Sequence, residues 1–158
     1  MSWSLEIRSG DLTLRGIQLG KVTDHQKLVQ DLRAALLEPQ GTDDAHFNFG
    51  SVIDGGRRPD GTQIPSLLAS VNWDRVAMDL ESEIRRIGND YQKRQLTRAQ
   101  SDRLTYGSST LSNNEILYNI TNIDMIQAQD VLLCNITLQT GSGEEKILLP
   151  ISAVPITT

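Results

Sequence analysis

Hydrophobic positions recur with a helical period in two segments of the chain. In the first, leucines stand at every fourth position from Leu28 to Leu36, which predicts one apolar face of an amphipathic helix. Thr23 and Gln26 have the spacing of a capping box, and Pro39 is a residue that ends helices. We therefore expect the first helix to start near Thr23 and to stop before Pro39.

The second segment predicts a longer helix. Its apolar positions are spaced four, four, three and four residues apart, at Val76, Leu80, Ile84, Ile87 and Tyr91. Asn72 or Asp74 is placed to cap its start, and Glu81 and Arg85 have the spacing of an i,i+4 ion pair. Polarity rises after Tyr91, so the pattern does not define the end of the helix.

The two ends of the chain alternate apolar and polar residues, which is typical of strands. Residues Leu5 to Leu19 predict two or three short strands, with turns at Gly10 and Gly16. Near the other end, one face is expected to carry Ile116, Tyr118 and Ile120 before a shift of face at Ile123 and Met125.

The final two apolar runs predict a β-hairpin. Leu132, Cys134, Ile136 and Leu138 share one side of the first run, and a Gly-Ser-Gly turn leads to the second. Pro150 has no N–H to donate, so we expect it at a sheet edge or a strand end. Residues of about 152–158 are expected to form a loose tail.

A glycine-rich stretch between Gly41 and Pro65 shows no period. Both phenylalanines of the protein, Phe47 and Phe49, lie in it, close to Val52. We interpret it as an ordered loop held by these apolar side chains, since unstructured loops of this length are uncommon within compact domains.

Together these patterns predict an α+β fold, with two main helices packed on a small mixed or antiparallel sheet and a C-terminal β-hairpin. The 158 residues suit a single domain spanning 1–158, with an aliphatic core, because aromatic residues make up only 4%. The start of the chain has no apolar run of signal-peptide length, and no segment has the length of a membrane span. We therefore expect a protein that binds no membrane and stays in a reducing compartment.

Charge and chemistry narrow the functional classes. The net charge of -5 argues against binding to nucleic acid. The single cysteine, Cys134, is interpreted as a buried apolar residue, and His46 with nearby acids is weak support for a metal site. Paired carboxylates suited to glycoside hydrolysis are not evident among Glu38, Asp43, Asp44, Glu81 and Glu83. We expect no enzyme activity, no metal and no cofactor.

Basic residues gather in the second half of the predicted long helix, at Lys93, Arg94, Arg98 and Arg103. One interpretation is a solvated helix end, where cations suit the helix dipole. The other is a docking patch for an acidic surface of a partner.

The order of several short motifs resembles one known family. They are the N-terminal Asp-Leu-Thr-Leu, then Gln30-Asp31-Leu32, Leu36-Leu37, Gly41-Thr42 and Phe47-Asn48-Phe49-Gly50-Ser51, followed by a long helix and a C-terminal sheet. From about Leu5 to Ile151 the chain resembles the small baseplate wedge family of contractile phage tails. Relatives of that family occur in type VI secretion systems and other contractile injection machines.

The resemblance implies a structural role. Such proteins join the baseplate wedge to the first ring of sheath subunits, in a six-fold assembly with other wedge subunits and tail tube or hub neighbours. It implies a location in the virion tail baseplate after synthesis in the bacterial cytoplasm. The hairpin from Val131 to Ile151 is the candidate for strand addition by a sheath subunit, with Leu132, Ile136 and Leu138 filling pockets.

Two further contacts are expected from the same resemblance. Arg94, Arg98 and Arg103 are candidates for the wedge core, and Phe47 and Phe49 form a third candidate contact. Many family members carry Glu-Pro-Arg after the long helix, whereas this chain reads Gln-Ser-Asp-Arg there, so Arg103 is the candidate for that arginine. The alternative function is a lysozyme-like cell-wall hydrolase, because some family members were labelled so.

Overall fold

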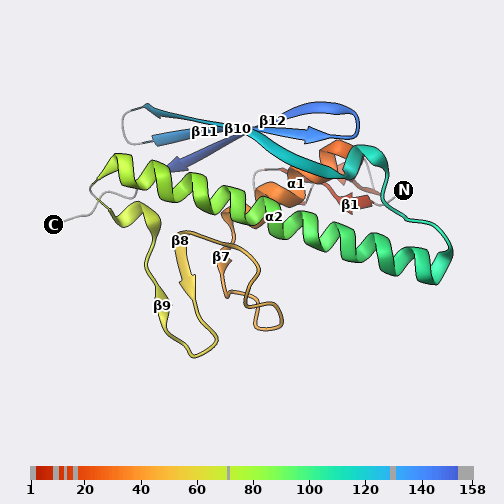
Figure 1. Cartoon of the computed structure of the whole chain (residues 1–158), viewed down its shortest axis with the longest axis horizontal. Coiled ribbons are helices and arrows are strands. Elements are labelled where there is room, and N and C mark those ends of the chain that lie inside the picture. Colours follow the sequence, from red (N-terminus) through yellow and green to blue (C-terminus); the bar gives the residue numbers. More distant parts are fainter. Residues whose placement is uncertain are drawn as a thin grey trace.

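The computed structural model describes residues 3–8, 11–12, 14–15, 18–70, 72–128 and 131–152. A three-stranded sheet from the C-terminal third forms one layer, two helices cover one of its faces, and a smaller sheet lies beyond the helices (Figure 1). The predicted α+β class, with helices against a small sheet and a C-terminal hairpin, is confirmed.

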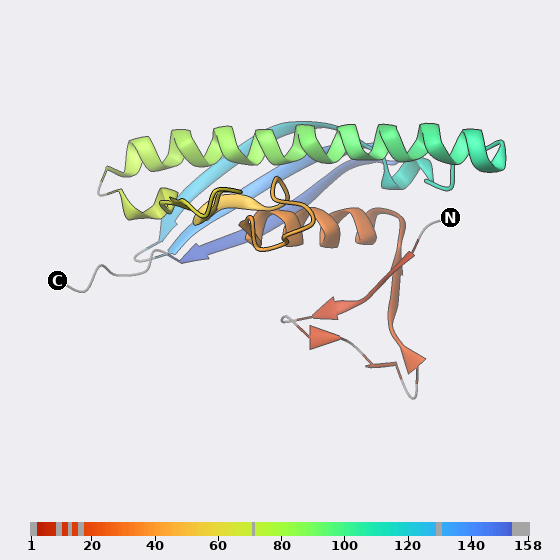
Figure 2. The ribbon, with the colours of Figure 1, turned by 90° about the horizontal axis from the view of Figure 1, so that it is seen from below.

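The two helices form where the hydrophobic period predicted them. Helix α1 spans Asp24–Leu37 and buries its leucine face. Helix α2 spans Trp73–Tyr106 and is capped by Asn72, whose Oδ1 accepts from the N–H of Arg75 at 3.2 Å. Its C-cap is Gly107, which has φ of 77° and so adopts the left-handed conformation that glycine favours. Its last turns reach beyond the sheet (Figure 2).

The main sheet is antiparallel in the order β10–β11–β12. Its strands are β10, Leu117–Ala128, β11, Val131–Thr140, and β12, Gly143–Ser152. The predicted hairpin is β11 and β12, joined by a tight turn after the Thr140–Gly143 pair. The expected tail lies almost wholly in residues 153–158, outside the described residues.

Three strands form the smaller sheet beyond the helices. Strand β7, Pro39–Gln40, pairs in parallel with β8, Ser51–Arg57, and β8 pairs antiparallel with β9, Gln63–Ile64. The expectation of a loop throughout residues 41–65 is therefore wrong for β8 and β9. A short 3-10 helix at Leu67–Ala69 precedes α2, and another at Asn113–Glu115 precedes β10.

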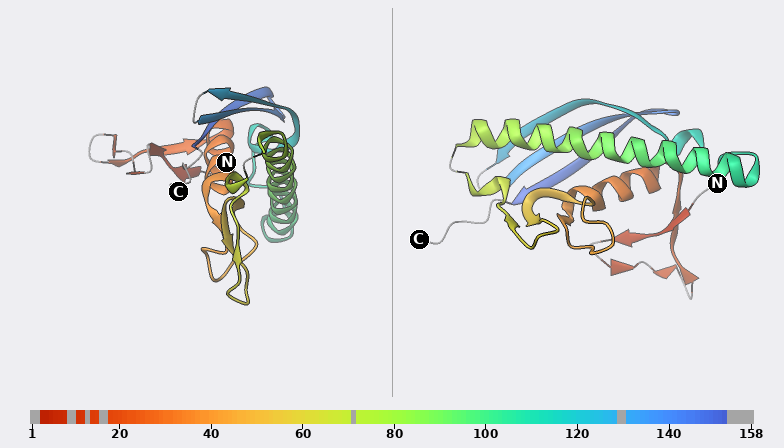
Figure 3. Two further views of the ribbon diagram at one scale, coloured as in Figure 1. Left: turned by 90° about the vertical axis from the view of Figure 1, so that its left-hand side faces the viewer. Right: turned by 60° about the horizontal axis from the view of Figure 1, so that its bottom comes forward.

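The first residues form an arm that extends from α1 (Figure 3). We call residues 3–23, as far as they are described, the N-terminal arm. Strand β1, Trp3–Leu5, pairs with β6, Lys21–Thr23, and two shorter pairs lie between them: β2, Ile7–Arg8, with β3, Asp11–Leu12, and β4, Leu14–Arg15, with β5, Gln18–Leu19. The predicted turns at Gly10 and Gly16 fall outside the described residues.

A single aliphatic cluster lies between the sheet and the helices. It joins the predicted helix faces to the inner faces of the strands, and includes Leu28, Leu32, Leu36, Leu80, Ile84, Ile136, Leu138, Ile147 and Leu149. Such contiguous burial of aliphatic side chains is the main favourable term in folding.

Two local predictions need correction. Thr23 is the N-cap residue of α1 but its side chain makes no capping hydrogen bond. In β10, Leu117 and Ile120 are buried while Tyr118 is 55% exposed, because the pairing register with β11 shifts on both sides of Asn119 and Ile120. These irregularities break the simple alternation that placed Tyr118 inward.

Candidate interaction surfaces

Strand β12 is an outer strand of the main sheet. Successive peptide groups of an antiparallel strand point alternately toward and away from the neighbouring strand. The carbonyl of Leu148 points away from β11, because it accepts a hydrogen bond from Arg33 Nη2 on α1 at 2.6 Å. Every second residue from Leu148 has the same orientation. The peptide groups of Glu144, Lys146 and Pro150 therefore also face away from β11. Pro150 thus lies on an edge strand, as predicted, where no ladder hydrogen bond requires its missing N–H.

The opposite edge is partly closed by α2. Gln92 Nε2 donates to the carbonyl of Tyr118, and Arg85 Nη1 donates to that of Ile120 at 3.2 Å. The register shifts in β10 fall in the same stretch. Capped carbonyls and bulges are common ways to prevent an edge from pairing with another chain, so β12 is the more open edge.

The leucine and isoleucine side chains expected to meet a partner are not on the surface. Strand β11 is the central strand, hydrogen-bonded on both sides. Leu132 is 5% exposed, and Ile136 and Leu138 are completely buried in the core. The prediction that they fill pockets of a sheath subunit is therefore wrong. These residues do share one face of the strand, but that apolar face belongs to this protein's own core.

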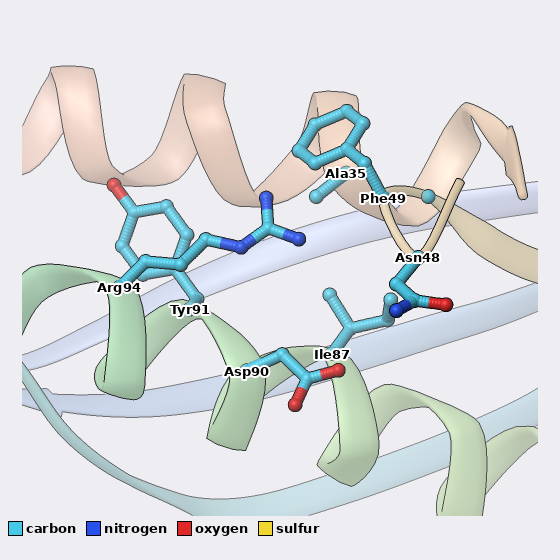
Figure 4. A pocket seen from close by; sticks show the side chains of 8 residues that line it. Ala35, Asn48, Phe49, Ile87, Asp90, Tyr91 and Arg94 are labelled. Carbon is cyan, nitrogen blue, oxygen red and sulfur yellow. The ribbon is translucent and has the colours of Figure 1, made fainter. Parts of the chain in front are cut away.

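Phe49 and Arg94 are brought together although they are distant in sequence. The Arg94 guanidinium carbon lies 4.9 Å from the centroid of the Phe49 ring, a distance typical of a cation–π contact. Both border a small cavity of about 10 Å³ between the helices, with Ala35, Ile87 and Tyr91 (Figure 4). Phe49 is half-buried against the core, so its first role is to hold the loop before β8 on the helices.

Tyr91 also connects the two helices. Its hydroxyl donates to Asp31 Oδ2 on α1 at 3.2 Å. Burial raises the pKa of Tyr91, and the negative charge of Asp31 raises it further, so the hydroxyl remains a hydrogen-bond donor. Tyr91 therefore fixes the spacing of the helices beside the Phe49–Arg94 contact.

The remaining candidates make other contacts, and Arg98 lines a further cavity of about 160 Å³ together with Arg94 and Tyr91. Phe47 is half-buried, with the Arg57 guanidinium 6.0 Å from its ring. Arg98 and Arg103 are exposed on the last turns of α2, and Arg98 is within 3.5 Å of the Thr110 hydroxyl. In the described part of the chain, Arg94, Arg98 and Arg103 have no carboxylate within ion-pair distance. These cations border an exposed helix end that also carries Leu104, 90% exposed.

Arg103 does not lie where the chain enters the sheet. It is within α2, and its carbonyl accepts from the N–H of Gly107. Glu115 and Ile116 lead into β10, which starts at Leu117. Glu115 is buried and accepts from the N–H of Ser112 at 2.8 Å, so it organises this junction. The expected match of Arg103 to the arginine of Glu-Pro-Arg is therefore wrong in position.

The carboxylates considered for catalysis have structural partners. Glu83 is buried on α2, where its Oε1 accepts from the N–H of Val52 at 2.8 Å and both oxygens accept from Arg86. Burial alone would raise the pKa of Glu83, but the hydrogen bonds from Arg86 and Val52 and the charge of Arg86 outweigh it and lower that pKa. A carboxylate held ionised in this way is unsuited to act as a general acid.

The other polar candidates are also explained locally. Asp43 Oδ2 lies 2.8 Å from His46 Nδ1, and Asp44 pairs with Arg57 at 2.8 Å, in exposed loop positions. Within the described ranges, no three His, Cys, Asp or Glu residues are grouped to hold a metal ion. Cys134 is fully buried, and burial raises the pKa of its thiol to about 11, which disfavours the nucleophilic thiolate.

Sequence reasoning missed the side chains that join distant elements. Arg33, Gln92 and Arg85 meet edge carbonyls, and Arg86 joins α2 to the carbonyl of Gly50 at 3.0 Å. Nothing in the local pattern distinguishes these residues from solvated positions on a helix.

Comparisons with known proteins returned no match: no family model, no curated protein and no solved structure is similar to this chain. Among the described helices, none combines the length and the apolar character needed to cross a membrane.

Proposed function

We propose that this protein is a structural subunit of the baseplate of a contractile tail or injection machine. In this proposal it joins the wedge to the first sheath ring and resides in the virion baseplate or its counterpart. The observation that carries the proposal is β12, an edge strand of ten residues with an outward row of peptide groups. An added strand would gain main-chain hydrogen bonds along it, which is a common mode of protein recognition.

The rest of the molecule supports an adaptor better than an enzyme. The buried carboxylate of Glu83 is paired with Arg86, and the cavity beside Phe49 and Arg94, of about 10 Å³, has no room for a substrate. The charged end of α2, with Arg94, Arg98 and Arg103, supplies a second candidate surface on a different element from β12. An adaptor needs two such surfaces, one for each neighbour.

Modest affinity at each surface suffices in a ring. In a six-fold assembly every joint is repeated, and each bound neighbour raises the effective concentration of the next. The proposed partners are the sheath subunit at β12 and other wedge subunits at the basic end of α2, with tail tube or hub neighbours nearby. Nucleic acid and membranes are not proposed as partners.

Mass spectrometry of purified tail-like particles from the source lysate tests this function. We expect this chain at a few copies against a large excess of sheath subunits. Absence from intact particles would overturn the baseplate proposal, and a one-to-one ratio with the sheath would overturn the adaptor role.

A matched pair of variants tests the surface. Lys146→Pro removes an outward N–H, as Pro150 does naturally, and leaves the hydrogen bonds to β11 in place. Lys146→Ala removes the side chain but keeps the N–H. We expect particles assembled with Lys146→Pro to lack sheath and those with Lys146→Ala to carry it, with circular dichroism confirming the fold of both. Normal sheath in both would exclude strand addition at β12.

A further inference from the structure

A groove opens between helix α1 and the N-terminal arm, and Arg33 connects it to the outward side of β12. Its volume is about 330 Å³. Its floor includes His25, Val29 and Arg33 from α1, and one wall includes Ile7 and Val22 from the arm. Arg33 belongs to both surfaces, because it lines the groove and donates to the carbonyl of Leu148 on β12.

The groove combines apolar surface with one unneutralised cation. Ile7 is 48% exposed and Val29 is half-buried, so a bound side chain would cover apolar area there. Among the described residues, no carboxylate lies within ion-pair distance of Arg33. Glu6, which also lines the groove, is buried and already interacts within the chain.

Arg33 already donates a hydrogen bond to the carbonyl of Leu148, which an added strand would need as an acceptor. Its guanidinium can bind a carboxylate with two parallel hydrogen bonds, which is stronger than one bond to a neutral carbonyl. An incoming segment with a carboxylate at this point would therefore draw Arg33 away from Leu148 and open the edge. A segment without one would have to break the existing hydrogen bond and gain nothing from Arg33.

We propose that β12 and the groove together bind an extended peptide segment of another protein. The segment pairs with β12 and carries an Asp or Glu side chain, which replaces the Leu148 carbonyl as the hydrogen-bond acceptor of Arg33. This proposal rests on the proposed function, since it names the chemistry of the strand that β12 accepts. The paired stretch runs from Gly143 to Leu148, because Pro150 offers no N–H beyond it. The five residue steps between Gly143 and Leu148 span about 17 Å of strand.

Selection from a displayed library of random octapeptides tests this recognition on the full chain. We expect the enriched peptides to alternate β-branched or other apolar residues with polar ones, and to carry an acid at one fixed position. Selected peptides are then synthesised and titrated against purified protein by fluorescence anisotropy. Lys146→Pro should abolish their binding, while Lys146→Ala should retain it.

Arg33→Met tests the cation, because it keeps the apolar length of the side chain and removes the charge. For an acidic peptide we expect binding to weaken about fivefold, the scale of one exposed ion pair. For the same peptide with Asp→Asn or Glu→Gln, binding to Arg33→Met should be equal to or tighter than binding to the unmodified protein. This crossover would not follow from loss of stability, which would weaken both peptides.

Three results would overturn the proposal: no enrichment on the unmodified protein, equal binding to Lys146→Pro, or an acid preference that survives in Arg33→Met. These outcomes are separate from the particle experiment. Acid-selective binding by a chain that is absent from tail particles would reject the baseplate function and keep the groove. Presence in the baseplate without acid-selective binding would keep the baseplate function and reject the groove proposal.

Discussion

Arg86 holds Glu83 with two parallel hydrogen bonds, from Nε to Oε2 and from Nη2 to Oε1, both at 2.7 Å. The same carboxylate accepts from the N–H of Val52, and Arg86 also donates to the carbonyl of Gly50. The pair thus fastens the smaller sheet to α2 through the backbone at both ends of the Gly50–Val52 segment.

This pair should make stability depend on pH. The pKa of Glu83 is lowered from its ordinary 4.5, so its contribution is complete above that value and is lost as pH falls through the folded pKa. We expect Glu83→Gln to cost about 1–3 kcal/mol of unfolding free energy at pH 7, because Gln cannot satisfy the partners equally. The difference from the unmodified protein should shrink on acidification, as measured by urea unfolding between neutral and acidic pH.

Glu81→Gln is the matched control for this prediction. Glu81 lies on the same helix and pairs with Arg85 at 2.9 Å, but its side chain is 47% exposed. An exposed pair contributes little, so this variant should follow the pH dependence of the unmodified protein. A difference for Glu83→Gln that is constant with pH would contradict the prediction.

Gly41 and Gly61 have similar φ angles but different surroundings. Replacing each by alanine therefore distinguishes the cost of a steric clash from the cost of the left-handed backbone conformation. Gly41 has φ of +77° and a Cβ there would lie 2.0 Å from the carbonyl oxygen of Arg57, whereas Gly61 has φ of +85° and nothing within 4 Å. Gly61→Ala should cost roughly 1 kcal/mol from the left-handed conformation alone. Gly41→Ala should cost about 3 kcal/mol, since backbone must move. Thermal unfolding of the two variants gives the comparison, and equal losses would refute it.

Gly88 allows α2 to approach strand β10. A Cβ at Gly88 would lie 2.5 Å from Ile120 Cδ1, the atom that Ile120→Val removes. We expect Gly88→Ala to be destabilising in the unmodified protein but neutral or stabilising in the Ile120→Val background, where helix propensity favours alanine by about 1 kcal/mol. A double-mutant cycle of unfolding free energies measures this coupling, and additive effects would show that the contact is unimportant.

Gln30 attaches the N-terminal arm to α1. Its Nε2 donates to the carbonyl of Leu5 at 2.7 Å, and its Oε1 accepts from the N–H of Ile7 at 3.0 Å. The side-chain amide therefore pairs with the backbone of the arm as a peptide group of a neighbouring strand would. We expect Gln30→Ala to increase hydrogen exchange at the Ile7 amide about tenfold while core amides of α1 stay protected. NMR exchange measures both sites, and Gln26→Ala, at an exposed position of the same helix, is the control.

Periodic burial was predictable, whereas long-range polar contacts were not. The spacing from Leu28 to Leu36 and from Val76 to Tyr91 reports which face is buried, because a helix repeats its environment every three to four residues. The hairpin was also predictable, because a strand alternates its environment every second residue and the turn residues mark where the chain reverses. Arg33 and Gln30, however, are polar residues on polar faces, and only the three-dimensional position of β12 and β1 gives them partners.

The candidate surface shows how a correct pattern led to a wrong assignment. Leu132, Ile136 and Leu138 do share one face, but alternation alone does not say whether that face meets the protein's own helices or another chain. The order of the strands in the sheet decides this. That order depends on pairing between distant segments, which a local sequence pattern does not show. The sequence predicts Phe49 and Arg94 as separate candidates, whereas their contact depends on the packing of a loop against α2.

The ladder between β11 and β12 also has a mechanical consequence. Its residue pairs run from Val131–Ser152 to Thr140–Gly143, with hydrogen bonds perpendicular to the strand axis. Tension along that axis would load these bonds together, in shear, whereas a pull across the sheet would open them one after another. The outer strand is therefore held most firmly against forces directed along its own length.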